Sequence, residues 1–394
     1  MLKKLLVPLL LALICISVVA EPESQSNENQ NLNDVKIDEN GNVFVAPLKY
    51  HISSDSTAEV IKDYSYEKLE SVVIPSEIRI DGHVYSVTSI GGSAFSWCSG
   101  LKNIEIPSSV TSIGDYAFYG CSGLTSIKIP SSVTNIGFGA FSLCIGLTRI
   151  KIPSGFTSIG KSAFWGCVGL TSIKIPSSVT SIGDSAFKDC SGLTSIKIPS
   201  SVTSIGDHAF EDCSGLTSIE IPSSVTSIGN KAFSECSGFT SIEIPSSVTS
   251  IGYGAFSECS GLTSINVTTD NAVYSSENGV LYDKKKTKLI CVPGAKKGKF
   301  EIPSSVTSIE SWAFSECSGL SRVKIPSNVT SIGDFAFKDC SGLTEIYIPS
   351  SVTHIEDWAF EDCKNLDVII DNSEENVTVG SCAFLGCRSV KYLK

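Results

Sequence analysis

The sequence predicts a β-rich repeat solenoid built from rungs of about 23 residues, and three observations support this class. Cysteines recur at one constant interval from Cys98 to Cys259 and again from Cys317 to Cys363. Phenylalanines recur in step, three residues before each of these cysteines. Each interval also holds short alternations of apolar and polar residues bounded by Pro and Gly, typical of strands joined by turns. Since one unit cannot bury its own apolar side chains, successive units are expected to stack into one coil.

A single rung, residues 190–212, contains the elements expected of every rung. Ile196-x-Ile198 alternates like a strand, and Pro199 ends it because proline removes a backbone donor. Residues 202–205 form a second, shorter extended piece rich in β-branched side chains. Asp207 is expected to cap a short helical turn that carries the Ala-Phe pair of the rung.

The chain begins with a predicted secretory signal peptide, residues 1–20. Lys3 and Lys4 precede an apolar run that ends in small residues at Ala20. The alternative is a transmembrane anchor, but the run is short for a bilayer span. Residues 21–45 are polar and acidic and are expected to form a flexible spacer. No later segment is expected to span a membrane, so the mature chain is expected to be secreted or held at a cell surface.

The composition and the motifs narrow the functional class. The chain is 42% hydrophobic and 18% charged, as expected for a folded protein. Its net charge of −11 disfavours nucleic acid as a partner. It contains no H-E-x-x-H, phosphate-loop or G-x-S-x-G motif, and no paired C-x-x-C of a zinc site. We therefore expect no catalytic residue, no cofactor and no metal, and an enzyme is the least favoured class.

The repeat Leu-x-x-Ile-x-Ile-Pro-x-x-Val-x-x-Ile-Gly-x-x-Ala-Phe-x-x-Cys resembles the BspA-type leucine-rich repeat of bacterial surface antigens, from about Leu69 to the C-terminus. The resemblance implies a right-handed leucine-rich-repeat coil with a parallel concave sheet, which in such repeats usually meets the ligand. It also implies an N-terminal cap and first rung over residues 46–97, followed by the solenoid over residues 98–394.

One interruption is expected within the solenoid. The step between Cys259 and Cys317 exceeds two repeats by a dozen positions. The insertion that accounts for this surplus is expected at about residues 267–296, and it includes two extended apolar stretches around a polar turn in residues 279–293. This pattern predicts a β-hairpin that projects from the coil, an interruption that the resembling family commonly carries.

The cysteine column is expected to consist of buried free thiols. Stacked rungs place neighbours about 4.8 Å apart, wider than the roughly 3.8 Å between Cβ atoms that a disulfide prefers. A bridged ladder is the alternative, since an even number of cysteines in a secreted chain favours disulfides. Cys382 lies outside the column and is a candidate to pair with Cys387, while Cys291 stands alone on the hairpin. The disulfide state of these three is left open.

Recognition is expected in the two outward columns that flank the second Ile of the first strand. One column carries lysine in four successive rungs, followed by two glutamates. The pattern is either a solvated face left by duplication or an electropositive strip for an anionic partner. The candidate ligand-binding residues of these columns are Asn103, Glu105, Lys128, Arg149, Lys151, Lys174, Lys197, Glu220, Glu243, Arg322, Lys324 and Tyr347.

Two further columns are candidates on the outer surface. Trp312, Phe335 and Trp358 share one position in three consecutive rungs and are expected to form an exposed aromatic row, either as local packing or as a platform for a sugar or a protein. Acidic residues precede the cysteine in later rungs, for solubility or for calcium bridging. They are Asp189, Asp212, Glu235, Glu258, Glu316, Asp339 and Asp362.

These observations favour a secreted or cell-surface binding or adhesion module that recognises an extracellular protein or glycan. The alternative is a structural surface-coat or spacer protein without a specific ligand. The two functions can be distinguished by mutation. A binding module loses its interaction when one face is mutated, whereas a spacer depends only on the length of the solenoid. The sequence does not indicate the ligand or the oligomeric state.

Overall fold

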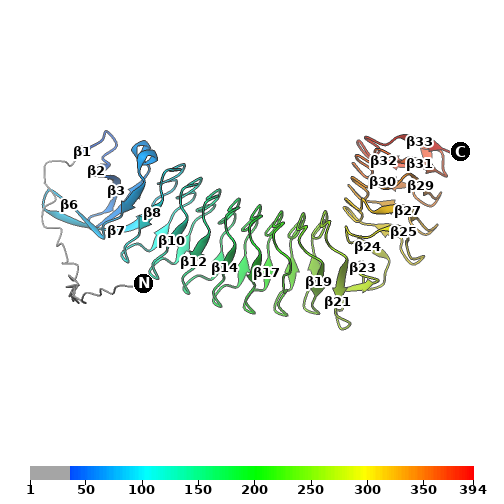
Figure 1. The fold of residues 1–394 in the computed structure, drawn as a ribbon, viewed down its shortest axis with the longest axis horizontal. Helices are drawn as coiled ribbons and strands as arrows, with labels where there is room; N and C mark the ends of the chain where they lie inside the picture. The colour runs from blue at the N-terminus through cyan, green and yellow to red at the C-terminus, as the bar shows by residue number, and fades with distance from the viewer. Residues whose placement is uncertain (1–35) are drawn as a thin grey trace, which may run out of the picture. The chain divides into compact units, whose positions relative to one another are not determined.

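The computed structural model describes residues 36–394, so the predicted signal peptide and residues 21–35 of the predicted spacer lie outside the described residues. The described chain forms a β-solenoid of about 13 turns, with rungs of about 23 residues and parallel sheets. Successive rungs stack side by side, as Figure 1 shows. The predicted fold class is confirmed.

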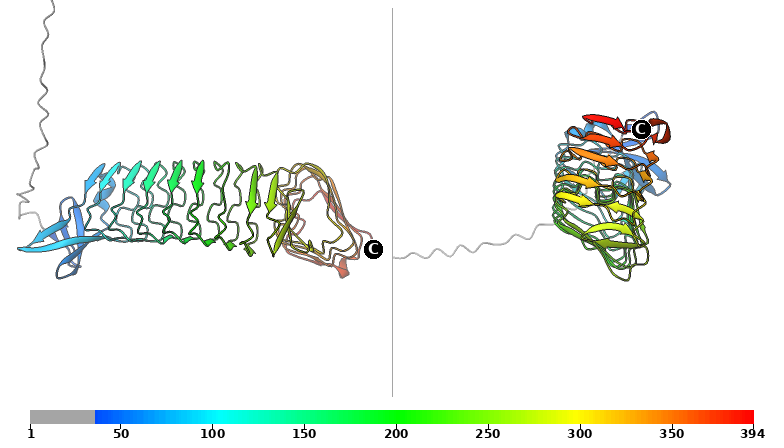
Figure 2. Two further views of the ribbon diagram at one scale, coloured as in Figure 1. Left: turned by 90° about the horizontal axis from the view of Figure 1, so that it is seen from below. Right: turned by 90° about the vertical axis from the view of Figure 1, so that its right-hand side faces the viewer.

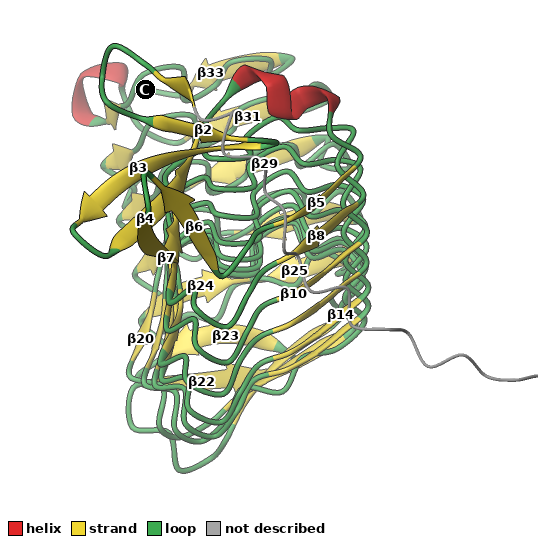
Figure 3. Cartoon of the chain, turned by 90° about the vertical axis from the view of Figure 1, so that its left-hand side faces the viewer, coloured by secondary structure: helices red, strands yellow, loops and turns green. Residues whose placement is uncertain are grey.

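Helix is nearly absent from the described residues. Only two short 3-10 helices occur there, η1 (Tyr64–Lys68) and η2 (Glu374–Asn376), and Figure 3 shows strands and loops elsewhere. Neither is long and apolar enough to cross a membrane.

Each regular rung contributes a first strand whose central Ile is buried and whose flanking side chains face solvent. In β10, for example, Ile127 is buried between the exposed Ser126 and Lys128. Pro ends most of these strands, as expected. They run parallel in several sheets, and Figure 2 shows their stacking. The first strands are β5 (Ser71–Val73), β8 (Asn103–Glu105), β10 (Ser126–Lys128), β12 (Arg149–Lys151), β14 (Ser172–Lys174), β16 (Ser195–Lys197), β19 (Ser241–Ile244), β21 (Ser264–Val267), β25 (Gly298–Glu301), β27 (Leu320–Lys324), β29 (Glu345–Ile348), β31 (Asp367–Ile370) and β33 (Ser389–Tyr392).

A second strand of two residues follows in each regular rung. Its Ile points into the core, and its partners in the neighbouring rungs occupy the same position one repeat away, as in Ser204↔Ser227. These strands are β9 (Ser112–Ile113), β11 (Asn135–Ile136), β13 (Ser158–Ile159), β15 (Ser181–Ile182), β17 (Ser204–Ile205), β18 (Ser227–Ile228), β20 (Ser250–Ile251), β26 (Ser308–Ile309), β28 (Ser331–Ile332), β30 (His354–Ile355) and β32 (Thr378–Val379).

The N-terminal cap begins earlier than expected. The predicted flexible spacer is wrong for residues 36–45, because they form two strands of an antiparallel ribbon that continues into the solenoid sheet. Between them Asp38 Oδ1 accepts the amides of Asn40 and Asn42 and closes the turn. The cap strands are β1 (Lys36–Ile37), β2 (Val43–Val45), β3 (Leu48–Ser54), β4 (Thr57–Ile61), β6 (Glu77–Ile80) and β7 (His83–Ile90).

The turn that carries the Ala-Phe pair differs from the expected helical turn. The residue before Ala and the residue before Cys both have positive φ, as His208 (57°) and Asp212 (51°) do. Two left-handed residues per turn prevent a helix. Local i→i+3 hydrogen bonds alternate instead with bonds to the next rung, so that the amide of Phe210 donates to the carbonyl of Ala232 at 2.8 Å.

Phenylalanine and cysteine ladders fill the core beside this turn. Ring centroids lie 5.3–5.8 Å apart from Phe95 to Phe256, with nearly parallel planes. The column thiols are free, those from Cys98 to Cys363 are buried, and most donate to the carbonyl of the phenylalanine in the preceding rung, as Cys190 does to Phe164 at 3.1 Å. This arrangement agrees with the predicted free-thiol ladder. The possible Cys382 pairing is not seen, because Cys382 and Cys387 are both free thiols.

The insertion does not project from the coil as expected. It forms an antiparallel set of β22 (Tyr274–Glu277), β23 (Val280–Asp283) and β24 (Lys288–Cys291), and β24 then pairs in parallel with β26. Most of its apolar side chains are buried, Leu281 and Leu289 fully, so it continues the core.

Cys291 does not stand alone. Its sulfur lies 3.7 Å from the carbonyl oxygen of Phe256, the same relation that column cysteines have to the preceding rung. Burial raises the pKa of the Cys259 thiol, and the neighbouring Cys291 thiol raises this pKa further. Cys291 therefore occupies the place between Cys259 and Cys317 and keeps the thiol ladder continuous through the insertion.

Candidate functional site

The lysine strip, defined as Lys128, Lys151, Lys174 and Lys197, lies on one four-stranded parallel sheet. The strands are β10, β12, β14 and β16, and each lysine is the register partner of the next. All four face solvent because the buried Ile precedes each of them. Arg149 lies beside the strip, in the neighbouring outward column of β12.

The strip is a run of unpaired positive charge. Within residues 36–394, none of its four lysines, nor Arg149, lies within 4.0 Å of a carboxylate oxygen. Two unit charges about 4.8 Å apart in water repel by on the order of 1 kcal/mol before salt screening. The fold tolerates this repulsion without local compensation.

The same columns are charge-paired in the C-terminal rungs. Arg322 lies 3.3 Å from Glu345, and Lys324 lies 3.6 Å from Glu301, in each case across neighbouring strands. Cross-strand pairs of opposite charge are the usual stabilising arrangement on a sheet. The outward columns are thus electrostatically different in the two stretches.

The other predicted column residues are distributed over separate sheets. Asn103 and Glu105 lie on β8, which pairs with β5, and Glu243 lies on β19, which pairs with β21. Glu220 is exposed but lies in a rung without an assigned first strand. Tyr347 lies on β29 in the C-terminal sheet, half-exposed, where a hydrogen bond to a neighbouring aspartate raises its pKa. The predicted ligand-binding residues therefore lie on several separate sheets. Among them, the four strip lysines and Arg149 form the one contiguous cationic group.

The aromatic row of Trp312, Phe335 and Trp358 forms as a stack of half-buried rings. The ring centroids are 4.3 Å and 6.3 Å apart, with interplanar angles of 18° and 4°. The rings cover one another, so the faces between them are not free. Lys231 Nζ lies 3.9 Å from the Trp312 centroid and covers the first face. The row therefore exposes ring edges rather than a flat platform.

The acidic column is partly buried and crowded. Burial, followed by the charges of neighbouring carboxylates, raises the pKa values of Asp212, Glu235 and Glu316. No group of three or more potential metal ligands occurs in the part of the chain that the structure describes. The calcium-bridging alternative therefore has no geometric support.

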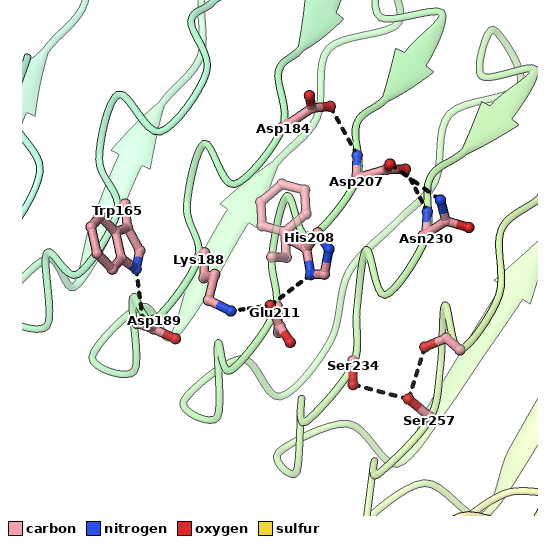
Figure 4. Close-up of polar contacts among 12 residues, drawn as sticks. Trp165, Asp184, Lys188, Asp189, Asp207, His208, Glu211, Asn230, Ser234 and Ser257 are labelled. Carbon is pink, nitrogen blue, oxygen red and sulfur yellow. Dashed lines mark hydrogen bonds and ion pairs between the residues drawn. The ribbon is translucent and has the colours of Figure 1, made fainter. Parts of the chain in front are cut away.

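A polar network beside this column was not expected from the sequence. Figure 4 shows Glu211 between Lys188 and His208, whose Nδ1 is 2.8 Å from Glu211 Oε2. Burial raises the pKa of Glu211, but the hydrogen bonds from both partners outweigh it and lower the pKa overall. In the same view Trp165 Nε1 donates to Asp189 Oδ2 at 2.8 Å.

Asp207 caps the next rung rather than its own turn. Its Oδ1 accepts the backbone amide of Asn230 at 2.7 Å, while its own amide donates to Asp184 Oδ1 at 3.1 Å (Figure 4). The three residues occupy one position in successive rungs. The recurrence of Asp and Asn in this column is the sequence signal, and its role becomes clear only when the rungs are stacked.

An apolar patch on the early rungs was also missed. Trp97 is 55% exposed, and Ile145 and Val168 are 48% and 43% exposed. They stand beside or within the cysteine turn, at positions that hold acids or serine in later rungs. This difference between early and late rungs is the signal that could have identified the patch.

Comparison with known proteins agrees with this geometry. The model of the BspA-type leucine-rich repeat region matches residues 59–194, 181–297 and 294–394. None of the curated proteins compared with the chain matches it. A leucine-rich cell surface protein of Faecalibacterium prausnitzii is a similar solved structure, with 28% identity, a TM-score of 0.63, and coverage of 90% of this chain and 95% of that one.

Two further solved structures share the fold. A leucine-rich repeat protein of Eubacterium ventriosum is 31% identical, with a TM-score of 0.53, over 63% of this chain and 80% of that one. The pneumococcal vaccine antigen PcpA is 23% identical, with a TM-score of 0.51, over 91% of this chain and 81% of that one. The repeat, the stacked rungs and the extent of the family match together show that this chain belongs to the BspA-type leucine-rich repeat family.

Proposed function

We propose that the protein is a secreted or surface-displayed binding module whose lysine strip recognises an anionic extracellular partner, either an acidic protein segment or a sulfated glycan. Its similarity to a cell surface protein of F. prausnitzii supports the location. The repeat fold by itself does not name a ligand, so the proposal depends on the surface chemistry of the strip.

The observation that carries the proposal is the in-register run of four lysines without ion-pair partners. The chain has a net charge of −11, so its overall field repels anions. At physiological salt the local field extends only about 8 Å, which spans neighbouring rungs. Recognition is therefore short-ranged, with Arg149 at one side and Glu220 and Glu243 marking the end of the footprint.

The test replaces all four strip lysines by glutamine and measures binding to immobilised heparin and immobilised poly-L-glutamate over a range of salt concentrations. A matched control replaces Lys285, Lys297, Lys299 and Lys391, which are exposed and unpaired in the described chain, so that both variants have the same net charge. We expect the strip variant to lose binding and its salt dependence, and the control to keep both.

Equal binding by the two variants would show that the strip is only a solvated face. If the wild-type protein captures neither probe, and extracellular fractions yield no partner that depends on the strip, the spacer alternative is favoured. Circular dichroism of both variants checks that the fold is retained, as expected for solvent-facing side chains.

A further inference from the structure

The regular turns are held to one another by backbone hydrogen bonds. In the rung before the insertion, the amides of Lys231, Phe233 and Glu235 donate to carbonyl oxygens of the next turn at 2.9–3.0 Å. The same three bonds occur in every rung from Ser93 onward up to this point. The donors alternate along the turn and all point toward the following rung.

This pattern stops at the insertion. The equivalent amides of Gly254, Phe256 and Glu258 have no hydrogen-bond acceptor within residues 36–394. On the far side, the backbone carbonyl groups of Ser311 and Ser315, which would normally accept such bonds, receive none from the described chain. These backbone groups are free to accept a polar partner, such as the backbone of another chain.

The cause is a shortened turn in the insertion rung. The amide of Glu310 donates to Leu289, and the amide of Val292 donates to Ala313, at 2.9 Å and 2.8 Å. These bonds place Leu289 and Val292 where a regular rung has the Ile of its second strand and the Phe of its ladder. The regular Ile and Phe are five positions apart, whereas Leu289 and Val292 are three apart. Two turn residues are therefore missing.

The missing residues leave a cavity of about 270 Å³, here called the notch, whose lining includes Gly254, Phe256, Ile290 and Trp312. A more open groove of about 430 Å³ adjoins it and shares Trp312. Trp312 and Phe335 of the aromatic row therefore line this groove.

The charges and rings that line the notch and groove narrow the ligand class. Four carboxylates, those of Asp283, Glu310, Asp334 and Glu356, line the notch and groove. Lys288 also lines the notch and pairs with Glu310 at 3.4 Å, and the ammonium groups of Lys231 and Lys338 lie over the Trp312 ring, so the carboxylates outnumber the nearby lysines by one. This excess of negative charge favours a cationic ligand.

We propose that the notch binds an extended peptide segment with basic side chains, supplied by another protein. Its carbonyl oxygens accept the amides of Gly254 and Phe256, and its lysine or arginine side chains meet the carboxylates of the groove. The segment thus replaces the missing part of the rung, in the way that an added strand completes a sheet edge. This site is separate from the lysine strip and has the opposite charge preference.

The test is hydrogen–deuterium exchange of the whole mature protein, read by mass spectrometry over residues 250–260. We expect the amides of Gly254, Phe256 and Glu258 to exchange faster than those of Lys231, Phe233 and Glu235. The probe is the acetylated, amidated peptide Lys-Gly-Lys-Gly-Lys. At ten times its measured dissociation constant, it is expected to slow exchange of Gly254 and Phe256 about elevenfold. The same peptide with glutamate for lysine, and spermidine, a polyamine without carbonyl groups, are expected to give no protection.

Two variants locate the effect. Ile290→Trp fills the notch and is expected to abolish protection, whereas Ile145→Trp adds the same side chain on a distant rung and is expected to leave it intact. Glu356→Gln, on the groove wall, preserves shape and is expected to weaken binding about two- to fivefold. If Ile290→Trp does not fold, Glu356→Gln carries the comparison.

Three results would overturn the proposal. The first is slow exchange of the three amides in the free protein, since the donors would then be paired. The second is the absence of protection by the lysine peptide, or equal protection by spermidine or the glutamate peptide. The third is protection that Ile290→Trp and Glu356→Gln leave unchanged.

Discussion

Replacing Phe210 by alanine tests whether the phenylalanine ladder holds the rungs together. Phe210 is fully buried, and its ring centroid lies 5.3 Å from that of Phe187 and 5.4 Å from that of Phe233. The substitution removes the ring from the middle of the array and leaves a cavity between two rungs. In a solenoid, each rung is stabilised mainly by its neighbours, so the damage falls on both interfaces.

The expected cost is about 3–5 kcal/mol in the free energy of unfolding, the range for truncating a buried phenylalanine. This range exceeds the simple transfer of the side chain, about 1.5–3 kcal/mol, because the cavity and the lost ring stacking add to it. The matched control is Phe138→Ala. Phe138 is only partly buried and contacts Tyr116 edge-on, with ring centroids 4.9 Å apart, so its loss is expected to cost about 1 kcal/mol.

Urea unfolding followed by circular dichroism measures both values. A cost for Phe210→Ala no greater than that for Phe138→Ala would refute the reasoning, because the ladder would then add nothing beyond surface packing. An unfolding curve with two separate transitions would support it further, as the array would have been divided at the altered rung.

Three further outcomes are expected. Asp207→Ala is expected to cost about 1 kcal/mol of stability, and Asp207→Asn much less, because only the first removes the acceptor for the Asn230 amide; thermal unfolding compares them. Iodoacetamide is expected to label Cys382 readily in the native protein, with the buried column thiols labelled only in denaturant, since burial raises the pKa of Cys190, for example, to about 12; intact mass counts the adducts. The carboxyl pKa values of Glu235 and Glu316 are higher in the folded than in the unfolded state, so the folded state binds protons more tightly at these groups. The two ionised carboxylates therefore destabilise the fold fully at neutral pH. This destabilisation is lost as the pH falls through the folded pKa toward the unfolded pKa. Glutamine at both positions is therefore expected to stabilise the protein at pH 7 and to flatten the pH dependence of unfolding, and unchanged stability at pH 7 would contradict this.

Much of the architecture could be predicted because each rung repeats the same short-range pattern. The spacing of phenylalanine and cysteine predicts both ladders, and the position of Lys128 beside Ile127 predicts an exposed lysine column. These features depend only on alternation along a strand and on stacking at a constant interval.

Features that depend on contacts between rungs could not be predicted in this way. In the regular turns the left-handed residues accompany alternate amides that bond to the next rung, an arrangement that a single rung does not contain. Asp207 resembles a helix cap in sequence, yet its acceptor serves Asn230 in the following rung. The integration of Cys291 into the thiol ladder depends on how the insertion folds back, which its local pattern does not specify.

The candidate sites also differ in how far the sequence could predict them. The strip was predicted from one column, but its lack of ion-pair partners required the structure. The notch was not predicted at all, because it arises from two residues missing between Leu289 and Val292, and the sequence marks the insertion only as a surplus.

The most direct test of the proposed function is acetylation footprinting of the lysines, with and without a bound anionic partner such as heparin. Acetylation of each lysine is quantified by mass spectrometry after brief treatment of the native protein. We expect Lys128, Lys151, Lys174 and Lys197 to be protected together when the partner is bound, while the exposed Lys285 is labelled to the same extent in both samples. Unchanged labelling of the four strip lysines, with protection elsewhere on the chain, would contradict recognition by the strip.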